Sequence, residues 1–205
     1  MKKLAIFALI LLGASVSAQA GDEAKGAQLA AQCAACHGKD GNSTTPMWPK
    51  LAGQNAEYIV KQLMDFKVGA ADKTKGRYEA SMAPMAANLS EQDMQDLAAY
   101  YMAQETQMGA VKAEFLELGK KIYFQGDAER GVPACAACHG ATGQGLNLAK
   151  YPSVSGQHPQ YAIKQLKMFA AGERNNDEAA VMRDIAIRMS EQQIEAVANF
   201  MLGLH

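Results

Sequence analysis

The chain has 205 residues, enough for one large domain or two small ones, and its 20 basic and 21 acidic residues nearly cancel. This balance excludes the strongly basic composition of nucleic-acid-binding proteins, so no nucleic-acid partner is expected. Methionine occurs 12 times against a single tryptophan. Because methionine fills core gaps but also ligates haem iron, each one has to be judged by its position.

The first predicted element is a targeting segment, residues 1–20. A lysine pair precedes the apolar run 4–12, and Ala-Gln-Ala at 18–20 has the small-x-small pattern of a cleaved secretory signal. A membrane anchor is the alternative, but the run is shorter than the roughly 20 residues that cross a bilayer. We expect cleavage after Ala20, a mature chain from Gly21 and export to the periplasm, with at most loose membrane association.

Next along the chain, Cys33-Ala34-Ala35-Cys36-His37 has the C-x-x-C-H pattern of a c-type haem attachment site, and Cys135-Ala136-Ala137-Cys138-His139 repeats it. Residues three apart lie on one face of a helical turn, so the two thiols of each motif can form thioethers with the two vinyl groups on one porphyrin edge. The histidine is then held beneath the iron, for which imidazole is a normal ligand. The sequence therefore predicts two covalently bound haem c groups.

Three other interpretations of the cysteines compete with haem. A C-x-x-C pair is also typical of thioredoxin-like thiols, and two pairs together can form a zinc site of four thiolates. Ordinary disulfides are the third alternative. Neither of the first two explains why a histidine directly follows both pairs, and C-x-x-C pairs rarely form structural disulfides.

The second half of the chain repeats the first, block by block and in the same order. The matched blocks are 33–37 with 135–139, 48–54 with 151–157, 58–63 with 161–166, and 90–92 with 190–192. This duplication predicts two domains, at 21–103 and 114–205, joined by a short linker at 104–113.

Each copy is expected to be all-α, because its apolar residues recur at helical spacing. In the last segment of each copy the apolar positions follow an i, i+3, i+4, i+7 pattern: Met94, Leu97, Ala98 and Tyr101, then Ile194, Val197, Ala198 and Met201. Capping boxes are expected to start these two helices, at Ser90 with Asp93 and at Ser190 with Gln193.

A charged loop precedes the last helix of the first copy. It carries four basic residues: Lys67, Lys73, Lys75 and Arg77. We expect these side chains to be solvated, and a docking patch for an acidic partner is the alternative.

The sixth ligand of each iron is expected at matching positions in the two copies. Only Met82 and Met182 match, each preceding its capping serine by the same spacing, whereas the histidines outside the motifs do not. We therefore predict that His37 with Met82 and His139 with Met182 ligate the two irons; paired core residues are the alternative, and Met85 and Met189 are nearby rivals. His/Met ligation raises the reduction potential and closes the iron to substrates.

Further residues are candidates for holding the imidazole or the porphyrin. A backbone carbonyl at Pro49 or Pro152 is placed to accept a hydrogen bond from the preceding motif's imidazole and fix the ring. Tyr58, Lys61, Tyr161 and Lys164 are candidates for binding haem propionates, and surface positions on amphipathic helices are the alternative.

As an ordered set, these motifs resemble the dihaem cytochromes c4 of bacterial respiratory chains. The resemblance covers nearly the whole mature chain: C-A-A-C-H-G, W-P-K-L-A-G-Q, Y-I-V-K-Q-L, M-A-P-M before S-E-Q-D, P-A-C-A-A-C-H, G-Q-H-P-Q-Y, R-N-N-D and V-M-R. It implies two tandem class I cytochrome c folds related by a pseudo-twofold axis, with the axial methionines at Met82 and Met182. Pro84 departs from the family pattern and is expected to stiffen the ligand loop.

The resemblance also implies a function. It predicts a periplasmic electron carrier, not an enzyme, that takes electrons from a quinol-cytochrome c reductase and delivers them to a terminal oxidase, with no small-molecule substrate. Two alternatives stay open: an electron-accepting subunit of a larger dehydrogenase, and a dihaem peroxidase. A peroxidase needs one iron with an open position, which a methionine in both copies argues against.

Overall fold

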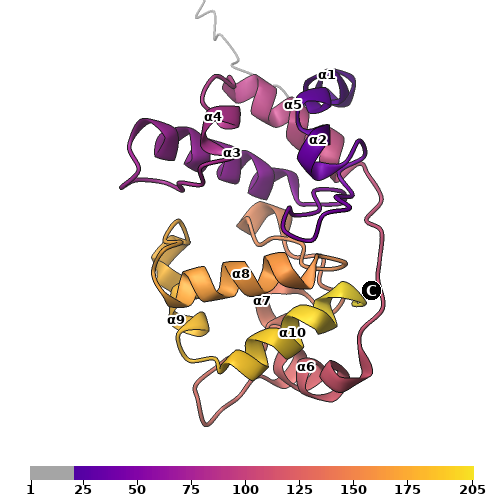
Figure 1. Cartoon of the computed structure of the whole chain (residues 1–205), viewed down its shortest axis with the longest axis vertical. Coiled ribbons are helices and arrows are strands. Elements are labelled where there is room, and N and C mark those ends of the chain that lie inside the picture. The colour runs from indigo at the N-terminus through magenta and orange to yellow at the C-terminus, as the bar shows by residue number, and fades with distance from the viewer. Residues whose placement is uncertain (1–20) are drawn as a thin grey trace, which may run out of the picture.

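The computed structural model describes residues 21–205, so the predicted signal segment lies outside the described residues. The described chain forms two helical halves, one above the other in Figure 1. The first half contains α1 (Glu23–Leu29), α2 (Ala34–His37), α3 (Ala56–Ala71), α4 (Ala83–Ala86) and α5 (Glu91–Met102). The second contains α6 (Ala113–Gln125), α7 (Ala136–His139), α8 (Pro159–Ala170), α9 (Val181–Ala186) and α10 (Glu191–Leu202).

The all-α prediction is confirmed. Between residues 21 and 205 there is no β-strand, only isolated bridges at Asp127–Val132 and Leu146–Tyr151. Short 3-10 turns cover the remaining regular segments: η1 (Ala30–Gln32), η2 (Asn147–Ala149) and η3 (Glu178–Ala180). None of the helices in this described part has the length and apolar character that a membrane span requires.

Each half is built around the contact between its first and last long helices. Gly26 of α1 lies against Asp96 of α5, and Gly119 of α6 lies against Ala196 of α10, so close that a Cβ on either glycine would fall within 2.5 Å of a backbone oxygen. The predicted capping boxes are present at Ser90 and Ser190. The apolar positions that helical periodicity marks in α5 and α10 are all buried in these cores.

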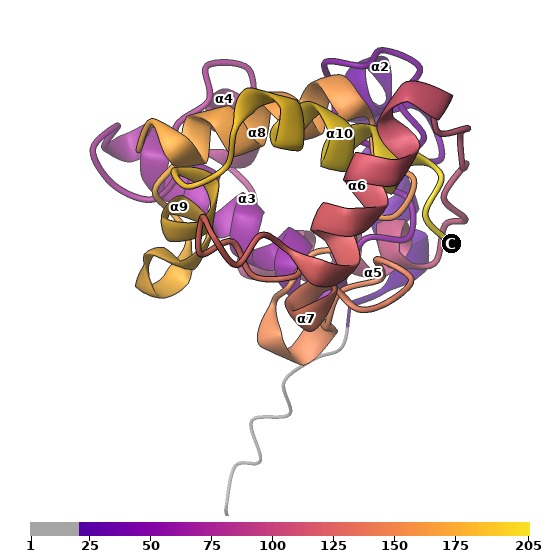
Figure 2. The same ribbon diagram turned by 90° about the horizontal axis from the view of Figure 1, so that it is seen from below.

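The two halves meet along a seam formed by α3, α8 and the loops before them (Figure 1), and in Figure 2 the lower half lies in front of the upper one. Contacts across the seam occur in reciprocal pairs. Gln54 of the first half binds the backbone of Ser153, and Gln157 of the second half binds the backbone of Lys50. Because matched residues exchange equivalent contacts, the halves are related by a pseudo-twofold axis.

The segment between α5 and α6 is an extended strap held against both halves. Asn42 bonds it twice, accepting from the Gln107 N–H at 2.8 Å and donating to the Glu105 carbonyl at 2.9 Å. The ammonium of Lys50 donates to the Gln107 carbonyl, and the Gly109 N–H donates to the Leu202 carbonyl at 3.0 Å. The strap therefore helps to fix the two halves in one arrangement.

One expectation about the charged loop is wrong. Arg77 is only 9% exposed and lies in the seam, so it is neither solvated nor part of an open docking patch. Lys73 and Lys75 are exposed loop residues, as expected, whereas Lys67 lies in α3 and its ammonium donates to the Leu89 carbonyl at 2.6 Å. The loop carries Arg77 inward because Gly76, with φ of +60°, turns the chain against α3, where the Arg77 N–H bonds the Asp65 carbonyl.

Candidate haem sites

The two C-x-x-C-H motifs form the short helices α2 and α7, each ended by a glycine in the positive-φ region. All four cysteines are free thiols, so the disulfide alternative is not realised. Among residues 21–205 no group of three or more His, Cys, Asp or Glu side chains is placed to hold a metal ion, so the zinc alternative finds no support. Burial raises the pKa of the Cys135 thiol to about 11.

Both motif histidines are oriented as the sequence predicted. His37 Nδ1 lies 2.9 Å from the Pro49 carbonyl oxygen, and His139 Nδ1 lies 3.0 Å from that of Pro152. A carbonyl accepts only, so Nδ1 carries the proton and leaves the Nε2 lone pair available. Burial, opposed by the carbonyl bond, lowers the pKa of both rings, which favours the neutral form that ligates iron.

The far nitrogen of His37 supplies the test of fit to a haem. His37 is 4% exposed, and its buried Nε2 has no hydrogen-bond partner among the described residues. Buried polar nitrogens are almost always paired, so an orphan with a free lone pair points to a ligand. Two buried hydroxyls in the same half, on Ser81 and Tyr101, also lack partners. A porphyrin tethered to Cys33 and Cys36 fits this arrangement.

The two matched methionines occupy corresponding places in the halves. Met82 is the residue before α4, Met182 lies in the first turn of α9, and both are half-buried. Helix α4 lies on the opposite side of the upper half from α2 (Figure 1). Of the rivals, Met85 is 38% exposed, and Met189 packs against the core of the second half. Ligation by Met82 and Met182 stays a prediction.

Sequence reasoning missed a cluster of buried polar side chains in the seam. Arg77 and Arg174 are both buried and lie over the rings of Phe66 and Phe169, at 4.6 and 4.4 Å from the ring centroids. Within residues 21–205, neither guanidinium forms a salt bridge with a carboxylate. The unequal loops before Met82 and Met182 hide the pairing of these arginines in the sequence.

The predicted propionate candidates lie at this cluster. Tyr58 accepts from Arg174 at 2.8 Å, and Tyr161 accepts from Arg77 at 3.4 Å. Lys61 is paired with Asp65 of its own helix, and Lys164 with Glu79 of the other half, so both lysines already have carboxylate partners. Burial raises the pKa of Tyr161, but the charges of Arg77 and Arg174 outweigh it and hold that pKa below its ordinary value.

Two buried cations without carboxylate partners are costly unless an anion joins them. A haem has two propionate carboxylates on the edge opposite its vinyl groups, which the thiols hold. The seam cluster therefore fits the propionates of haems whose vinyl edges are tethered at α2 and α7.

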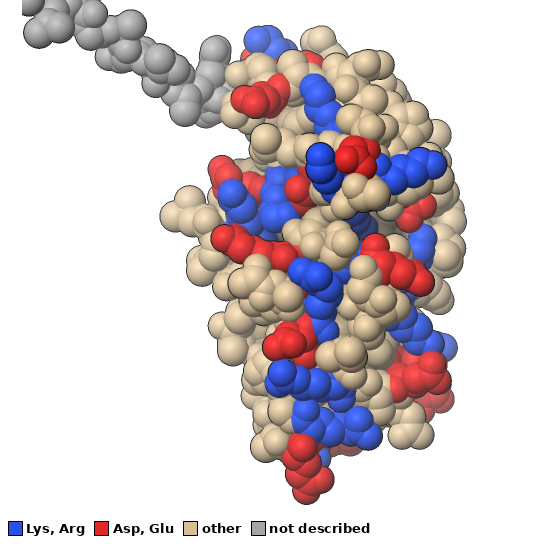
Figure 3. Space-filling view, turned by 90° about the vertical axis from the view of Figure 1, so that its left-hand side faces the viewer, with Lys and Arg blue, Asp and Glu red and all other residues tan. Residues whose placement is uncertain are grey.

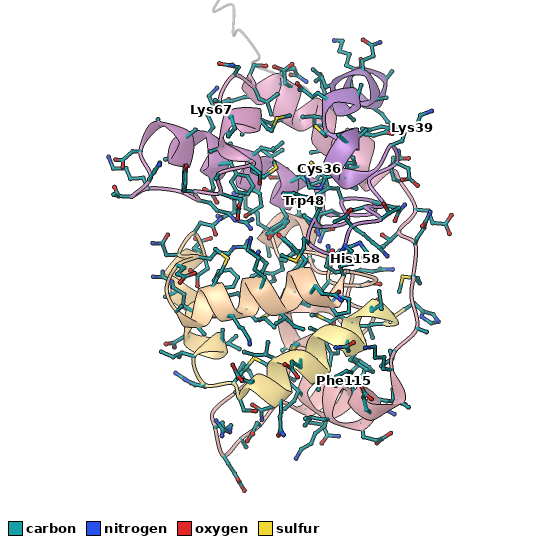
Figure 4. All side chains as sticks on the ribbon, viewed as in Figure 1. Cys36, Lys39, Trp48, Lys67, Phe115 and His158 are labelled. Atoms are coloured by element: carbon teal, nitrogen blue, oxygen red, sulfur yellow. The ribbon has the colours of Figure 1, made fainter. Side chains whose placement is uncertain are left out.

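In Figure 4, Cys36 and Trp48 lie in the upper half and His158 lies beside the boundary between the halves.

Comparison with known proteins identifies both halves separately. The sequence profile of the cytochrome c family matches twice, at residues 23–104 and 116–205. Cytochrome c4 of Azotobacter vinelandii is 43% identical over 100% of both chains. A thiosulfate dehydrogenase electron acceptor of Stutzerimonas stutzeri is 39% identical, over 96% of this chain and 92% of its own length.

The arrangement of the halves also has a counterpart among solved structures. The crystal structure of reduced recombinant cytochrome c4 from Pseudomonas stutzeri superposes with a TM-score of 0.88. It is 42% identical in sequence and covers 91% of this chain and 100% of its own. The likeness therefore extends over both halves and the seam between them.

Proposed function

The chain belongs to the cytochrome c family as a dihaem cytochrome c4, and from that premise we propose that it carries electrons in the periplasm from a quinol-cytochrome c reductase to a terminal oxidase. It is an electron carrier with two covalent haem c groups. The observation that supports a carrier best is the duplication of the whole ligand framework. Each half has an attachment helix, a histidine tied to a proline carbonyl, and a methionine at the matching place.

A bound haem supplies one reversible electron at its iron, and the chain supplies everything that controls that change. Cys33, Cys36, Cys135 and Cys138 tether the two groups. We assign His37 with Met82 to one iron and His139 with Met182 to the other. With both axial positions filled, neither iron is open to peroxide, which argues against the peroxidase alternative.

The seam completes this assignment. We propose that Arg77 and Arg174 bind propionates, because both are buried, lie together in the seam and donate to neutral side-chain oxygens and not to carboxylates. Since each arginine bonds side chains of both halves, haem binding and the association of the halves reinforce one another. Such an arrangement would hold the propionate edges of both haems at the same seam, which favours electron transfer between them.

The surface gives no preference for a strongly charged partner on the face shown in Figure 3. Lys and Arg side chains alternate there with Asp and Glu, and no single-sign field covers that face. Several exposed acidic and basic residues are also paired, such as Arg188 with Asp184. Partner docking on this face therefore depends little on long-range steering.

An electron-accepting subunit of a dehydrogenase is the second candidate. It is favoured by the likeness to the thiosulfate dehydrogenase electron acceptor, which covers both halves. The two candidates differ only in the donor, because both need two haems that accept and release electrons.

Export and domain division belong to the same proposal. We propose that residues 1–20 are removed, that 21–103 and 114–205 are the two cytochrome domains, and that 104–113 joins them. Gly21 packs against the Gln95 carbonyl of α5, where a Cβ would lie 2.1 Å from the oxygen, so the proposed first residue of the mature chain is part of the folded domain.

Rapid mixing of the haem-loaded protein with candidate partners tests the function. We expect a quinol-oxidising complex to reduce it and a terminal oxidase to oxidise it, both faster than catalytic turnover in the membrane. Fast reduction only by a thiosulfate-oxidising enzyme with its substrate would favour the subunit alternative. Turnover of hydrogen peroxide by the purified protein would contradict the carrier assignment.

A further inference from the structure

Two glutamines bridge the seam, and each forms two hydrogen bonds with the backbone of one residue in the other half. Gln157 accepts from the Lys50 N–H at 2.9 Å and donates to the Lys50 carbonyl at 3.0 Å. Gln54 accepts from the Ser153 N–H at 2.8 Å and donates to the Ser153 carbonyl at 2.9 Å. The same two-bond contact therefore occurs twice, once in each direction.

The two residues bound by the glutamines, Lys50 and Ser153, directly follow the prolines whose carbonyls orient the histidines. The Lys50 N–H and the Pro49 carbonyl belong to one peptide group, and that carbonyl accepts from His37 Nδ1. In the same way the Ser153 N–H shares a peptide group with the Pro152 carbonyl, which accepts from His139 Nδ1. Each imidazole is thus connected, through a single peptide group, to a glutamine of the opposite half.

The glutamines are themselves held in place by their own halves. Gln54 Oε1 accepts from the Asn55 N–H at 2.9 Å, and Gln157 Oε1 accepts from the His158 N–H at 3.0 Å, directly before α3 and α8. Gln54 is only 7% exposed, so a lost partner is not simply replaced by bulk water.

Hydrogen bonds in series polarise one another. An acceptor at a peptide N–H shifts electron density toward the carbonyl of the same group and makes that carbonyl a better acceptor. A stronger bond from Nδ1–H raises the basicity of the imidazole as a ligand. A more basic ligand stabilises ferric iron and lowers the reduction potential.

We infer that Gln157 is a positioning residue for His37, and Gln54 for His139, so that each half lowers the reduction potential of the haem held by the other. This inference rests on the proposed function, because it takes the two histidines as iron ligands. The seam then has two roles: it joins the two domains, and it tunes the reduction potential of both haems.

Redox titration of the haem-loaded Gln157→Met and Gln54→Met variants tests the inference, since Met has nearly the shape of Gln but neither accepts nor donates strongly. The two haems are followed separately by NMR, with haem-methyl signals assigned through contacts to α2 or α7. Gln157→Met is expected to raise the potential of the haem at α2 more than that of the haem at α7. Gln54→Met is expected to do the reverse, and in each variant the Nδ1–H signal of the affected histidine moves upfield.

Asn55→Leu is the matched control. Asn55 also crosses the seam, donating to the carbonyls of Gln144 and Tyr151 at 3.0 and 2.7 Å. It does not bond either of the two peptide groups, Pro49–Lys50 and Pro152–Ser153, that connect a glutamine to a histidine. This variant is expected to leave both potentials closer to those of the parent than the glutamine variants do. If Gln157→Met does not accumulate with haem, Gln157→Asn withdraws the amide by one methylene and makes the same test.

Equal shifts of both haems, a larger shift in the half that carries the substitution, or no shift would overturn the inference while leaving the carrier function intact. Finding fewer than two haems per chain in the parent protein would instead overturn the proposed function, and the inference with it.

Discussion

Arg77 and Arg174 share the same two acceptors, Oε1 of Gln62 and Oε1 of Gln165. Arg77 donates to them at 2.8 and 2.7 Å, and Arg174 donates at 3.1 and 2.8 Å. One arginine and one glutamine come from each half. Two like charges therefore lie together in a buried site whose hydrogen-bond acceptors are neutral oxygens, and bound anions would offset the cost of burying them.

This arrangement predicts the sign of an arginine substitution. In the haem-loaded protein, Arg77→Met or Arg174→Met is expected to lower the free energy of unfolding by about 3–5 kcal/mol, because a propionate is left buried without its cation. Denaturant unfolding followed by haem absorbance measures the change. Arg188→Met, which removes a pair exposed on the surface, is the control and should cost less than about 1 kcal/mol. Stabilisation by the seam substitutions would mean that no anion is bound there.

The helix contacts at Gly26 and Gly119 predict a second effect. Alanine at either position places a Cβ against the backbone of the facing helix, so Gly26→Ala and Gly119→Ala are each expected to destabilise the protein by about 1–3 kcal/mol. Thermal unfolding of the variants measures this. Lys120→Ala, beside Gly119 but exposed, should change stability by no more than about 0.5 kcal/mol. An unchanged melting temperature in both glycine variants would contradict the close packing.

The two capping boxes predict different responses to acid. Hydrogen bonds from Ser90 lower the pKa of Asp93, whereas the corresponding residue in the second half is Gln193, which does not titrate. A carboxyl whose pKa is depressed on folding stabilises the fold above its unfolded pKa of about 3.9, and that stability is lost as the pH falls through the folded pKa. Asp93→Ala should therefore destabilise the protein more at pH 7 than at pH 3.

Substituting the capping residue of the other half is the comparison for this pH effect. Ser190→Ala removes the hydroxyl that accepts from the Gln193 N–H at 3.2 Å, a bond between two neutral groups, so its destabilisation should not fade in acid as that of Asp93→Ala does. Stability measured from pH 3 to pH 7 for the two variants distinguishes them. A constant effect of Asp93→Ala across this range would show that its charge does not matter.

The axial assignment predicts equal and separable losses. Met82→Ala and Met182→Ala should each convert one iron to a form without its sulfur ligand and remove about half of the Met-to-ferric charge-transfer absorption. Met85→Leu, which changes a half-exposed neighbour of the ligand loop, should leave that band intact. If Met85→Leu removes absorption and Met82→Ala does not, the ligand of the first half is Met85.

Much of the structure follows from local sequence. The periodicity at Met94 and Ile194 marks buried helix faces, and Ser90 and Ser190 start helices, because caps and helix faces are set by residues within one or two turns. The carbonyls of Pro49 and Pro152 were also predictable, since the short loop after each motif returns to its histidine. Those features explain the helical fold of each half and the orientation of each motif imidazole.

The seam was not predictable in this way. Arg77 is a charged residue in a charged loop, and only the approach of the second half makes its position buried. Gln54 and Gln157 match in the sequence repeat, yet a match does not show that each binds the other half. Asn42 and Lys50 contact strap residues more than 50 positions further along the chain, so local sequence does not indicate these contacts either. All of these contacts depend on how the two folded domains pack against each other. Helical periodicity and capping patterns carry no information about that packing.

The most direct test of the central claim is to measure haem per chain and the spin state of the ferric iron in protein matured by its own host. We predict two c-type haems per chain, both low-spin, because the proposed ligands of each iron are a histidine and a methionine. One haem per chain, or a high-spin population in the native protein, would contradict this account.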